Sequence, residues 1–308
     1  MENTEIFSFF SSEFYYLHIA YVFLFGLIFG SFFNVCIYRI PLGMSIVKPG
    51  SHCFNCNYFL KWYDNIPLLS YLLLRGKCRK CGAIYSVRYF LVELLTGILF
   101  TIVFLKYNYS WATLVYIIVT SLLIIITFTD IDHWIIPDSI NLGGFIFGVL
   151  VALIIPFLGN DFYISTFGPI KEKMYFTPLL NCLAGAGAGF LLFYLIGFFG
   201  SLAFKKEAMG GGDIKLMTFV GAFVGHINIF LIMMIASLLG VLIAISTFGA
   251  SKIYKLLHKK EEVSQKPSLY HHIPFGPYLA VSTYIILVWG HEIVAWIEKT
   301  LFYPMKLI

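Results

Sequence analysis

The sequence contains little charge. Only 12% of its 308 residues are charged and 59% are hydrophobic, whereas a typical soluble domain carries about 25% charged residues. Such a chain has too few polar groups to cover a surface exposed to water. The composition therefore excludes an ordinary soluble protein and indicates an integral membrane protein.

Two further patterns are missing. The apolar segments lack the alternation of apolar and polar positions that a transmembrane β-barrel needs; they are continuous, as in LVYIIVTSLLIIITF at residues 114–128. Continuous runs predict spanning helices, whose backbone hydrogen bonds are satisfied within lipid. The first residues, MENTEIFSFFSSEF, lack the basic n-region of a cleaved signal peptide. We therefore expect the first apolar run to be retained as a helix.

The apolar runs predict an all-α polytopic membrane protein with about eight transmembrane helices. Seven runs are long enough to cross a hydrocarbon core of about 30 Å; they begin near Leu17, Phe90, Trp111, Ile140, Leu179, Ile229 and Phe275. An eighth, from Ile214 to His226, has about two-thirds of the usual length. We interpret it as a span in a locally thinned or water-accessible region.

Basic residues set the expected orientation, because cytoplasmic loops are enriched in Lys and Arg. Three clusters lie at Arg39–Arg88, Lys205–Lys215 and Lys252–Lys266. Eight spans with the N-terminus outside place these clusters, and the turn from Asp130 to Asp138, in the cytoplasm. If the short run did not span, the third cluster would lie outside, against the rule.

The chain is expected to divide into three parts. Residues 1–38 hold the N-terminal segment and first transmembrane helix, residues 39–89 a small cytoplasmic module, and residues 90–308 a seven-helix membrane core. A module of about 50 residues buries too little apolar surface to be stable without a staple.

Two C-x-x-C pairs could supply the additional stabilisation that this module needs. Cys53 and Cys56 form one pair, Cys78 and Cys81 the other, with 21 residues between them. This spacing is close to that of zinc ribbons and predicts a tetrahedral Zn²⁺ on four thiolates. Four protein ligands leave no open position, so we expect the zinc to be structural. Redox chemistry is the alternative, although a reducing cytosol disfavours disulfides.

Acidic residues near the cytoplasmic ends of the spans are candidate functional groups, because a charge at membrane depth costs about 2.5–3.5 kcal/mol on insertion scales. They are Asp130, Asp132, Asp138, Asp213 and Glu93. Asp138 follows a proline, so a helix N-cap is the favoured interpretation. Asp132 is expected where the third helix leaves the membrane, either solvated or supporting other groups. Glu93 is expected to reach the interface, to pair with a nearby base, or to serve the site.

Asp130 and Asp213 form the most informative pair, since one ends a span and the other begins one at the same expected depth. Two neighbouring carboxylates share a proton, so one can act as a base and the other as an acid. Such a pair can activate water for attack on an amide and then protonate the leaving nitrogen. A proton or cation relay in a transporter is the alternative.

Three glycines, Gly210, Gly211 and Gly212, directly precede Asp213. Because they have no Cβ atoms, an extended peptide could approach the backbone beside the carboxylate. A protease needs an extended substrate, since a helical peptide bond is shielded by its own hydrogen bonds. The glycines therefore favour a protease, with a flexible linker as the alternative.

Several motifs together resemble the type IV prepilin peptidases, a family of intramembrane aspartyl proteases with a G-x-G-D motif. They are the two C-x-x-C pairs, GSFFNVCIYRIP at 30–41, NIPLLSYLLLRGKC at 65–78, RYFLVELL at 88–95, TDIDHWIIPD at 129–138 and GGGD at 210–213. In that family one catalytic aspartate stands seven residues before the proline of an Ile-Pro step, and the other ends G-x-G-D. These positions correspond to Asp130 and Asp213.

The resemblance implies cleavage of the short basic leader of prepilins or pseudopilins after a glycine, at the cytoplasmic face of the bacterial inner membrane. It also implies N-methylation of the new N-terminus with S-adenosylmethionine, for which the sequence offers no recognisable Rossmann-type loop. The expected partners are these substrates and the lipid bilayer, with no nucleic acid.

Overall fold

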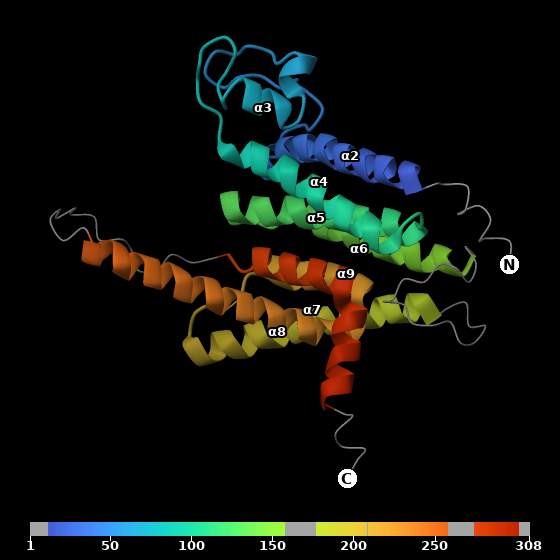
Figure 1. Ribbon diagram of the computed structural model, residues 1–308. Helices are drawn as coiled ribbons and strands as arrows, with labels where there is room; N and C mark the ends of the chain where they lie inside the picture. The colour runs from blue at the N-terminus through green and yellow to red at the C-terminus, as the bar shows by residue number, and fades with distance from the viewer. Residues whose placement is uncertain (1–11, 158–176, 208, 258–273, 302–308) are drawn as a thin grey trace. The chain divides into compact units, whose positions relative to one another are not determined.

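The computed structural model describes residues 12–157, 177–207, 209–257 and 274–301. Within these ranges the chain is helical and has no β-strand, which confirms the predicted all-α class (Figure 1). The long helices are α2 (Ser12–Arg39), α4 (Val87–Tyr107), α5 (Trp111–His133), α6 (Asp138–Ile154), α7 (Thr177–Phe204), α8 (Gly211–Leu257) and α9 (Gly276–Leu301). The short ones are α3 (Leu69–Leu73) and the 3-10 helices η1 (Trp62–Asn65) and η2 (Ile155–Phe157).

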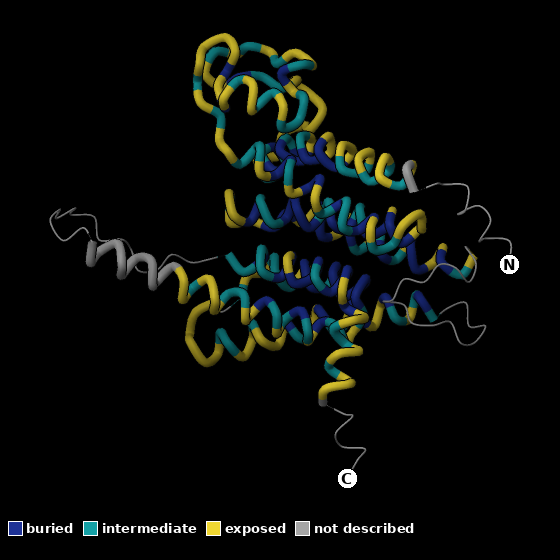
Figure 2. The backbone as a smooth tube through the Cα atoms, in the orientation of Figure 1, coloured by how far each residue is buried: buried dark blue, intermediate teal, exposed yellow. Residues whose placement is uncertain are grey.

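All seven long helices have the length and apolar composition needed to cross a membrane. Large apolar side chains remain exposed on them; Leu24 and Ile28 of α2, for example, are 52% and 59% exposed. Figure 2 shows exposed positions recurring along the helices. A surface of this kind is unfavourable in water and suited to lipid, so the exposed side chains agree with the predicted membrane protein.

Helix α8 consists of two arms joined at Gly225, whose φ of 72° and ψ of 170° are not helical. The chain reverses there, because Met217 before the break and Ile229 after it both lie against Gly189 of α7. The first arm, residues 211–224, is about 21 Å long at 1.5 Å per residue. The described residues thus hold seven candidate membrane spans, the first arm of α8 covers most of the predicted short run Ile214–His226, and the count of eight spans stays a prediction.

The chain divides into two compact units, residues 1–129 and 130–308. This division follows the packing between helices, whereas the three predicted parts follow composition along the sequence. The two units are described separately below.

In unit 1, α2 packs along α4. Two glycines of α2 permit a close approach: a Cβ on Gly26 would lie 2.8 Å from the Cα of Gly97, and one on Gly30 would lie 2.7 Å from the Cα of Glu93. Small residues commonly bring membrane helices together in this way. The packing places Glu93 directly against α2, and the segment between the two helices forms the cysteine module.

In unit 2, the first arm of α8 forms the core. Its residues with no exposed surface are Leu216, Met217, Phe219, Val220, Ala222 and Phe223. Glycines on two neighbouring helices make room for it: Gly144 of α6 faces the ring of Phe219, and Gly185 of α7 touches the backbone of Gly221. Because protein surrounds this arm, it does not need to match the full hydrocarbon thickness. A short, buried and rigid helix thus carries Asp213.

Most of the predicted external loop at 159–178 and of the polar connector at 249–273 lies outside the described residues. The basic residues Lys259, Lys260 and Lys266 lie outside them as well. The orientation with the N-terminus outside stays a prediction.

Candidate active site and metal centre

Unit 2 contains a cavity of about 790 Å³ where several helix ends meet. Its lining comes from the end of α5, the loop before α6, the start of α8 and the segment before α9. The lining residues are Asp130, Trp134, Ile135, Ile136, Asp138, Glu207, Met209, Gly210, Gly211, Gly212, Asp213, Pro274 and Phe275. The fold therefore places the two aspartates that the sequence paired on one cavity.

Asp130 lies in the last turn of α5 and is only 7% exposed. The first residue of α9, Gly276, donates a backbone hydrogen bond to its carboxylate. A Cβ on Gly276 would collide with Oδ2 of Asp130. The start of α9 can approach the carboxylate this closely only because residue 276 is glycine.

Asp213 lies half-buried in the first turn of α8, where its N–H donates to the carbonyl of Gly210 at 3.1 Å. Ile136 packs beside this turn: its Cβ would lie 3.0 Å from a Cβ on Gly212, and its Cδ1 3.1 Å from a Cβ on Gly276. One isoleucine therefore contacts both the segment that carries Asp213 and the segment that binds Asp130.

The N-terminal ends of α6, α8 and α9 border the cavity. The first N–H groups of a helix lack partners within that helix, and the helix dipole places a partial positive charge there. Helix N-termini therefore bind and stabilise anions. The arrangement can stabilise a carboxylate, or the negative charge that develops on a carbonyl oxygen during attack.

The three glycines before Asp213 differ in their surroundings. Gly210 and Gly211 are exposed, and a Cβ on Gly211 would meet no atom within 4 Å. Gly212 is instead covered by Ile136. Gly210 and Gly211 therefore leave room for the predicted approach of a peptide to the backbone, whereas Ile136 occupies the space beside Gly212; the approach itself stays a prediction.

Asp138 begins α6, but the N-cap is Pro137 and no side-chain capping bond is present. The predicted N-cap role of Asp138 is wrong, because its carboxylate binds Lys215 of α8, whose Nζ lies 2.7 Å from each oxygen. Both side chains are exposed, so the pair contributes little stability. Its effect is to join the start of α6 to the first turns of α8.

The remaining acidic candidates, Asp132 and Glu93, are not among the residues that line the aspartate cavity. Asp132 is exposed at the end of α5, as predicted. Glu93 belongs to unit 1 and is only 9% exposed; its Oε2 accepts a hydrogen bond from Leu68 N–H at 2.8 Å, and the Ser31 hydroxyl also bonds it. Glu93 is buried under α2, and the contacts of its carboxylate are neutral donors in place of the predicted base; its position at the membrane interface stays a prediction.

The four cysteines of unit 1 form a candidate metal centre, with all Sγ atoms within 4.8 Å of one another. The Cys53–Cys81 and Cys56–Cys78 sulfur distances are 3.8 Å and 3.9 Å. A tetrahedral zinc with bonds of about 2.3 Å separates its sulfurs by about 3.8 Å, whereas a disulfide bond measures about 2.05 Å. The cluster fits a zinc ion and does not fit a disulfide.

The two C-x-x-C turns share one local structure. Each ends at a residue with positive φ, Asn57 at 53° and Gly82 at 71°, whose N–H donates to the carbonyl of the first cysteine at 2.9 Å. The N–H of the second cysteine in each pair faces the sulfur of the first. The N–H groups that face the sulfurs lower the pKa of Cys53 and Cys78, that of Cys78 to about 6, whereas burial and the neighbouring thiols raise the pKa of Cys56 to about 11. The first cysteine of each pair is therefore the one favoured in the thiolate form that binds a metal.

Asp64 links the two turns through hydrogen bonds. Arg79, inside the second C-x-x-C pair, binds its Oδ1 at 2.7 Å, while the Tyr58 hydroxyl and the Lys61 N–H each lie 3.3 Å from its Oδ2. Burial alone would raise the pKa of Asp64, but Arg79 and these donors together lower it. The carboxylate therefore stays ionised and joins the parts of the module.

Comparison with known proteins assigns the chain to a family. Residues 24–107 match the family model of the bacterial peptidase A24 N-terminal domain, and residues 117–245 match that of the type IV leader peptidase family. This chain belongs to the type IV leader peptidase family. The bacterial relatives and the seven apolar helices indicate a multi-pass inner-membrane protein.

Similar proteins of this family are named prepilin leader peptidase/N-methyltransferase. One from Aeromonas salmonicida is 32% identical over 93% of this chain and 96% of its own length, and one from Neisseria gonorrhoeae is 32% identical over 91% and 94%. One from Myxococcus xanthus is 39% identical over 74% of this chain, and the aligned region spans 63% of that relative. No solved structure matches the chain.

Sequence reasoning missed the contribution of the segment before α9 to the aspartate cavity. Pro274 and Phe275 line the cavity, and Gly276 binds Asp130. The available signal was the sequence PFGP at the start of the last apolar run, where a glycine stands between a phenylalanine and a proline. That pattern predicts a helix start, but nothing local indicates that this start contacts Asp130.

Proposed function

We propose that this chain is a membrane-embedded aspartyl endopeptidase that removes the basic leader of type IV prepilins or pseudopilins, cutting after a glycine at the cytoplasmic face. The observation that carries the proposal is the single cavity lined by Asp130 and Asp213. Membership of the leader peptidase family supports it, as do the names of the relatives. The two carboxylates alone are equally compatible with a peptidase and a transporter. Family membership favours the peptidase.

In this proposal Asp130 and Asp213 share one proton, because two adjacent carboxylates do not both ionise. The ionised carboxylate removes a proton from a water molecule, whose oxygen attacks the carbonyl carbon of the scissile peptide bond. The protonated carboxyl then gives its proton to the leaving nitrogen as the C–N bond breaks. The N-termini of α8 and α9 stabilise the negative oxygen of the tetrahedral intermediate.

The lining of the cavity suits an extended, basic substrate. Gly210 and Gly211 leave the backbone beside Asp213 accessible, so an extended peptide can lie against it. Glu207 lines the same cavity and is exposed, and its negative charge complements a basic leader. An acidic side chain at this position offsets the repulsion expected from the basic residues Lys205 and Lys206.

We further propose that the chain N-methylates the new N-terminus with S-adenosylmethionine, the second activity in the relatives' names. We also propose that Cys53, Cys56, Cys78 and Cys81 hold a structural Zn²⁺. The cysteine module has only η1 and α3 as regular elements, so a metal would supply much of its folding free energy. With four thiolate ligands the metal has no free position for substrate.

Incubation of the purified protein in detergent with a full-length prepilin tests this function. Mass spectrometry is expected to show loss of the leader without any added donor, and a further methyl group on the new N-terminus when S-adenosylmethionine is present. A prepilin in which the glycine before the junction is replaced by leucine is the control and should stay intact. An uncut wild-type prepilin in the presence of folded protein would contradict the proposal.

A further inference from the structure

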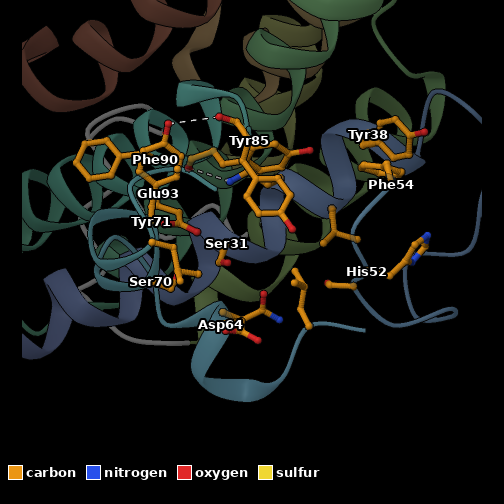
Figure 3. A pocket seen from close by; sticks show the side chains of 18 of the residues that line it. Ser31, Tyr38, His52, Phe54, Asp64, Ser70, Tyr71, Tyr85, Phe90 and Glu93 are labelled. Atoms are coloured by element: carbon orange, nitrogen blue, oxygen red, sulfur yellow. Dashed lines mark hydrogen bonds between the residues drawn. The ribbon is translucent and has the colours of Figure 1, made fainter. Parts of the chain in front are cut away.

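Unit 1 contains a cavity of its own, of about 220 Å³, which the peptidase chemistry does not use. It lies where α2, α4 and the cysteine module meet. Figure 3 shows Tyr38 and Phe54 together on one side of it and Tyr71, Phe90 and Glu93 together on another. We propose that this cavity binds the methyl donor and that Glu93 faces the donor's positively charged sulfonium. The inference rests on the N-methylation proposed above.

The strongest evidence is the buried acid. Glu93 is 9% exposed, and its contacts are the neutral donors Leu68 N–H and the Ser31 hydroxyl. Of the basic residues on the cavity, Arg39 donates to the carbonyls of Ser45 and Pro49 at 3.0 Å and 2.8 Å, the Nδ1 of His52 lies 3.1 Å from the carbonyl of Gly50, and Lys77 is exposed. A buried carboxylate held by neutral groups is unfavourable, and a cationic ligand would compensate it.

A second buried group also requires a ligand. Asn34 is 4% exposed and lines the cavity. Its Nδ2 donates to the carbonyls of Gly30 and Tyr89 at 3.2 Å and 3.1 Å, so the amide orientation is fixed. Its Oδ1 has no hydrogen-bond partner among the described residues. Buried acceptors are rarely left unpaired, and an amino or hydroxyl group of a ligand would satisfy this oxygen.

Aromatic rings line the cavity and could contact both a cation and a purine ring. Tyr38 and Phe54 have ring centroids 5.2 Å apart, and Tyr71 and Phe90 have centroids 5.6 Å apart. The faces of such rings attract cations and stack on flat heterocycles. A cavity of 220 Å³ is larger than the roughly 150 Å³ that accommodates benzene, so it has room for the sulfonium and an adjoining ring.

The chemistry balances with the groups named. The unprotonated N-terminal amine of the processed substrate attacks the methyl carbon of S-adenosylmethionine, a C–N bond forms and the C–S bond breaks. The donor leaves as the neutral thioether S-adenosylhomocysteine, and the positive charge passes from sulfur to the methylated nitrogen. Glu93 therefore faces one positive charge before and after transfer, which is a suitable role for a fixed carboxylate.

Ligand binding tests this assignment without depending on turnover. The full-length protein in detergent is titrated calorimetrically with S-adenosylmethionine, which is cationic, and with S-adenosylhomocysteine, which is neutral. We expect the wild type to bind the cation about tenfold more tightly, and Glu93→Gln to lose that preference while keeping its affinity for the thioether. The glutamine retains an oxygen that can accept the Leu68 N–H, so the fold should persist; melting temperature and zinc content verify this.

Two further variants complete the design. Leu74→Trp, which fills the cavity from its lining, should abolish binding of both ligands, whereas Glu298→Gln makes the same charge change at an exposed position of α9 and should bind like the wild type. Unchanged binding in Glu93→Gln and Leu74→Trp would overturn the site while leaving methylation intact. Equal loss of both ligands in Glu93→Gln would overturn the sulfonium contact. Failure of the wild type to bind either ligand would overturn the proposed methylation itself.

Discussion

Asp130 and Asp213 are positioned by neighbours that have little or no side chain. Gly276 allows the start of α9 to reach the carboxylate of Asp130, and Gly212 allows Ile136 to pack against the turn that carries Asp213. A Cβ at either glycine would displace backbone that holds a carboxylate. The positions of the two carboxylates therefore depend on the lack of a Cβ atom at Gly212 and Gly276.

Replacement of Gly276 by alanine tests this dependence. The added Cβ would collide with Oδ2 of Asp130, and a displacement of about 1 Å in a catalytic group typically costs about 100-fold in rate. Gly276→Ala should therefore cut prepilin about 100-fold more slowly, measured by gel mobility. Gly143→Ala, where a Cβ meets no atom within 4 Å, is the control, and equal rates in the two variants would contradict the account.

Single residues were predictable from the sequence where the chemistry is local. The spacing of the four cysteines predicted their cluster, and the expected membrane depth of Asp130 and Asp213 predicted their pairing. The partners of Glu93 and Asp138 could not be predicted, because Leu68 and Lys215 lie far from them along the chain. Gly276 was missed for the same reason, since a glycine at a helix start has many ordinary explanations.

The first arm of α8 is the element on which the aspartate cavity depends. It is enclosed by α6 and α7, and Gly185 of α7 lets the two backbones meet at Gly221. Hydropathy predicted that this segment is short, but it could not show the reversal at Gly225 or the enclosure that makes a short helix acceptable. The reversal and the enclosure both result from packing between helices, which the period and length of a single apolar run do not predict.

Paired alanine substitutions on α7 test the importance of this packing. Gly185→Ala places a Cβ against the Gly221 carbonyl, and overpacking of this kind typically costs about 1–3 kcal/mol. Its melting temperature in detergent should fall, and cleavage activity should fall with it. Gly187→Ala, two residues away and exposed with no atom within 4 Å, should melt like the wild type. Indistinguishable melting of the two variants would argue against a close α7–α8 contact.

At the scale of the whole molecule, the two candidate sites belong to different compact units. The cysteine cluster and the 220 Å³ cavity lie in unit 1, and the aspartate cavity lies in unit 2. The sequence predicted a separate cysteine module, but it placed the boundary at residue 89 because the composition changes there. The first compact unit instead runs to residue 129, within α5, which composition does not indicate.

This separation predicts that loss of the metal affects the two activities unequally. Cys53→Ser should reduce the zinc content from about one ion per chain to near zero, measured by mass spectrometry of the metal. Leader cleavage should fall by less than about tenfold, because local unfolding of one unit leaves the other folded. Cys36→Ser changes a buried cysteine of α2 that lies outside the cluster and should retain zinc. Full zinc content in Cys53→Ser would refute the assigned ligands.

The central claim is that Asp130 and Asp213 act together as the catalytic pair, and substitution of each by asparagine tests it most directly. Asparagine keeps the size of the side chain and removes its capacity to exchange protons. Asp132→Asn, an exposed acid two residues from Asp130, is the matched control. Purified variants are compared for the initial rate of leader release from a prepilin in detergent. The account predicts no detectable release by Asp130→Asn or Asp213→Asn and near wild-type release by Asp132→Asn; wild-type release by either of the first two would contradict it.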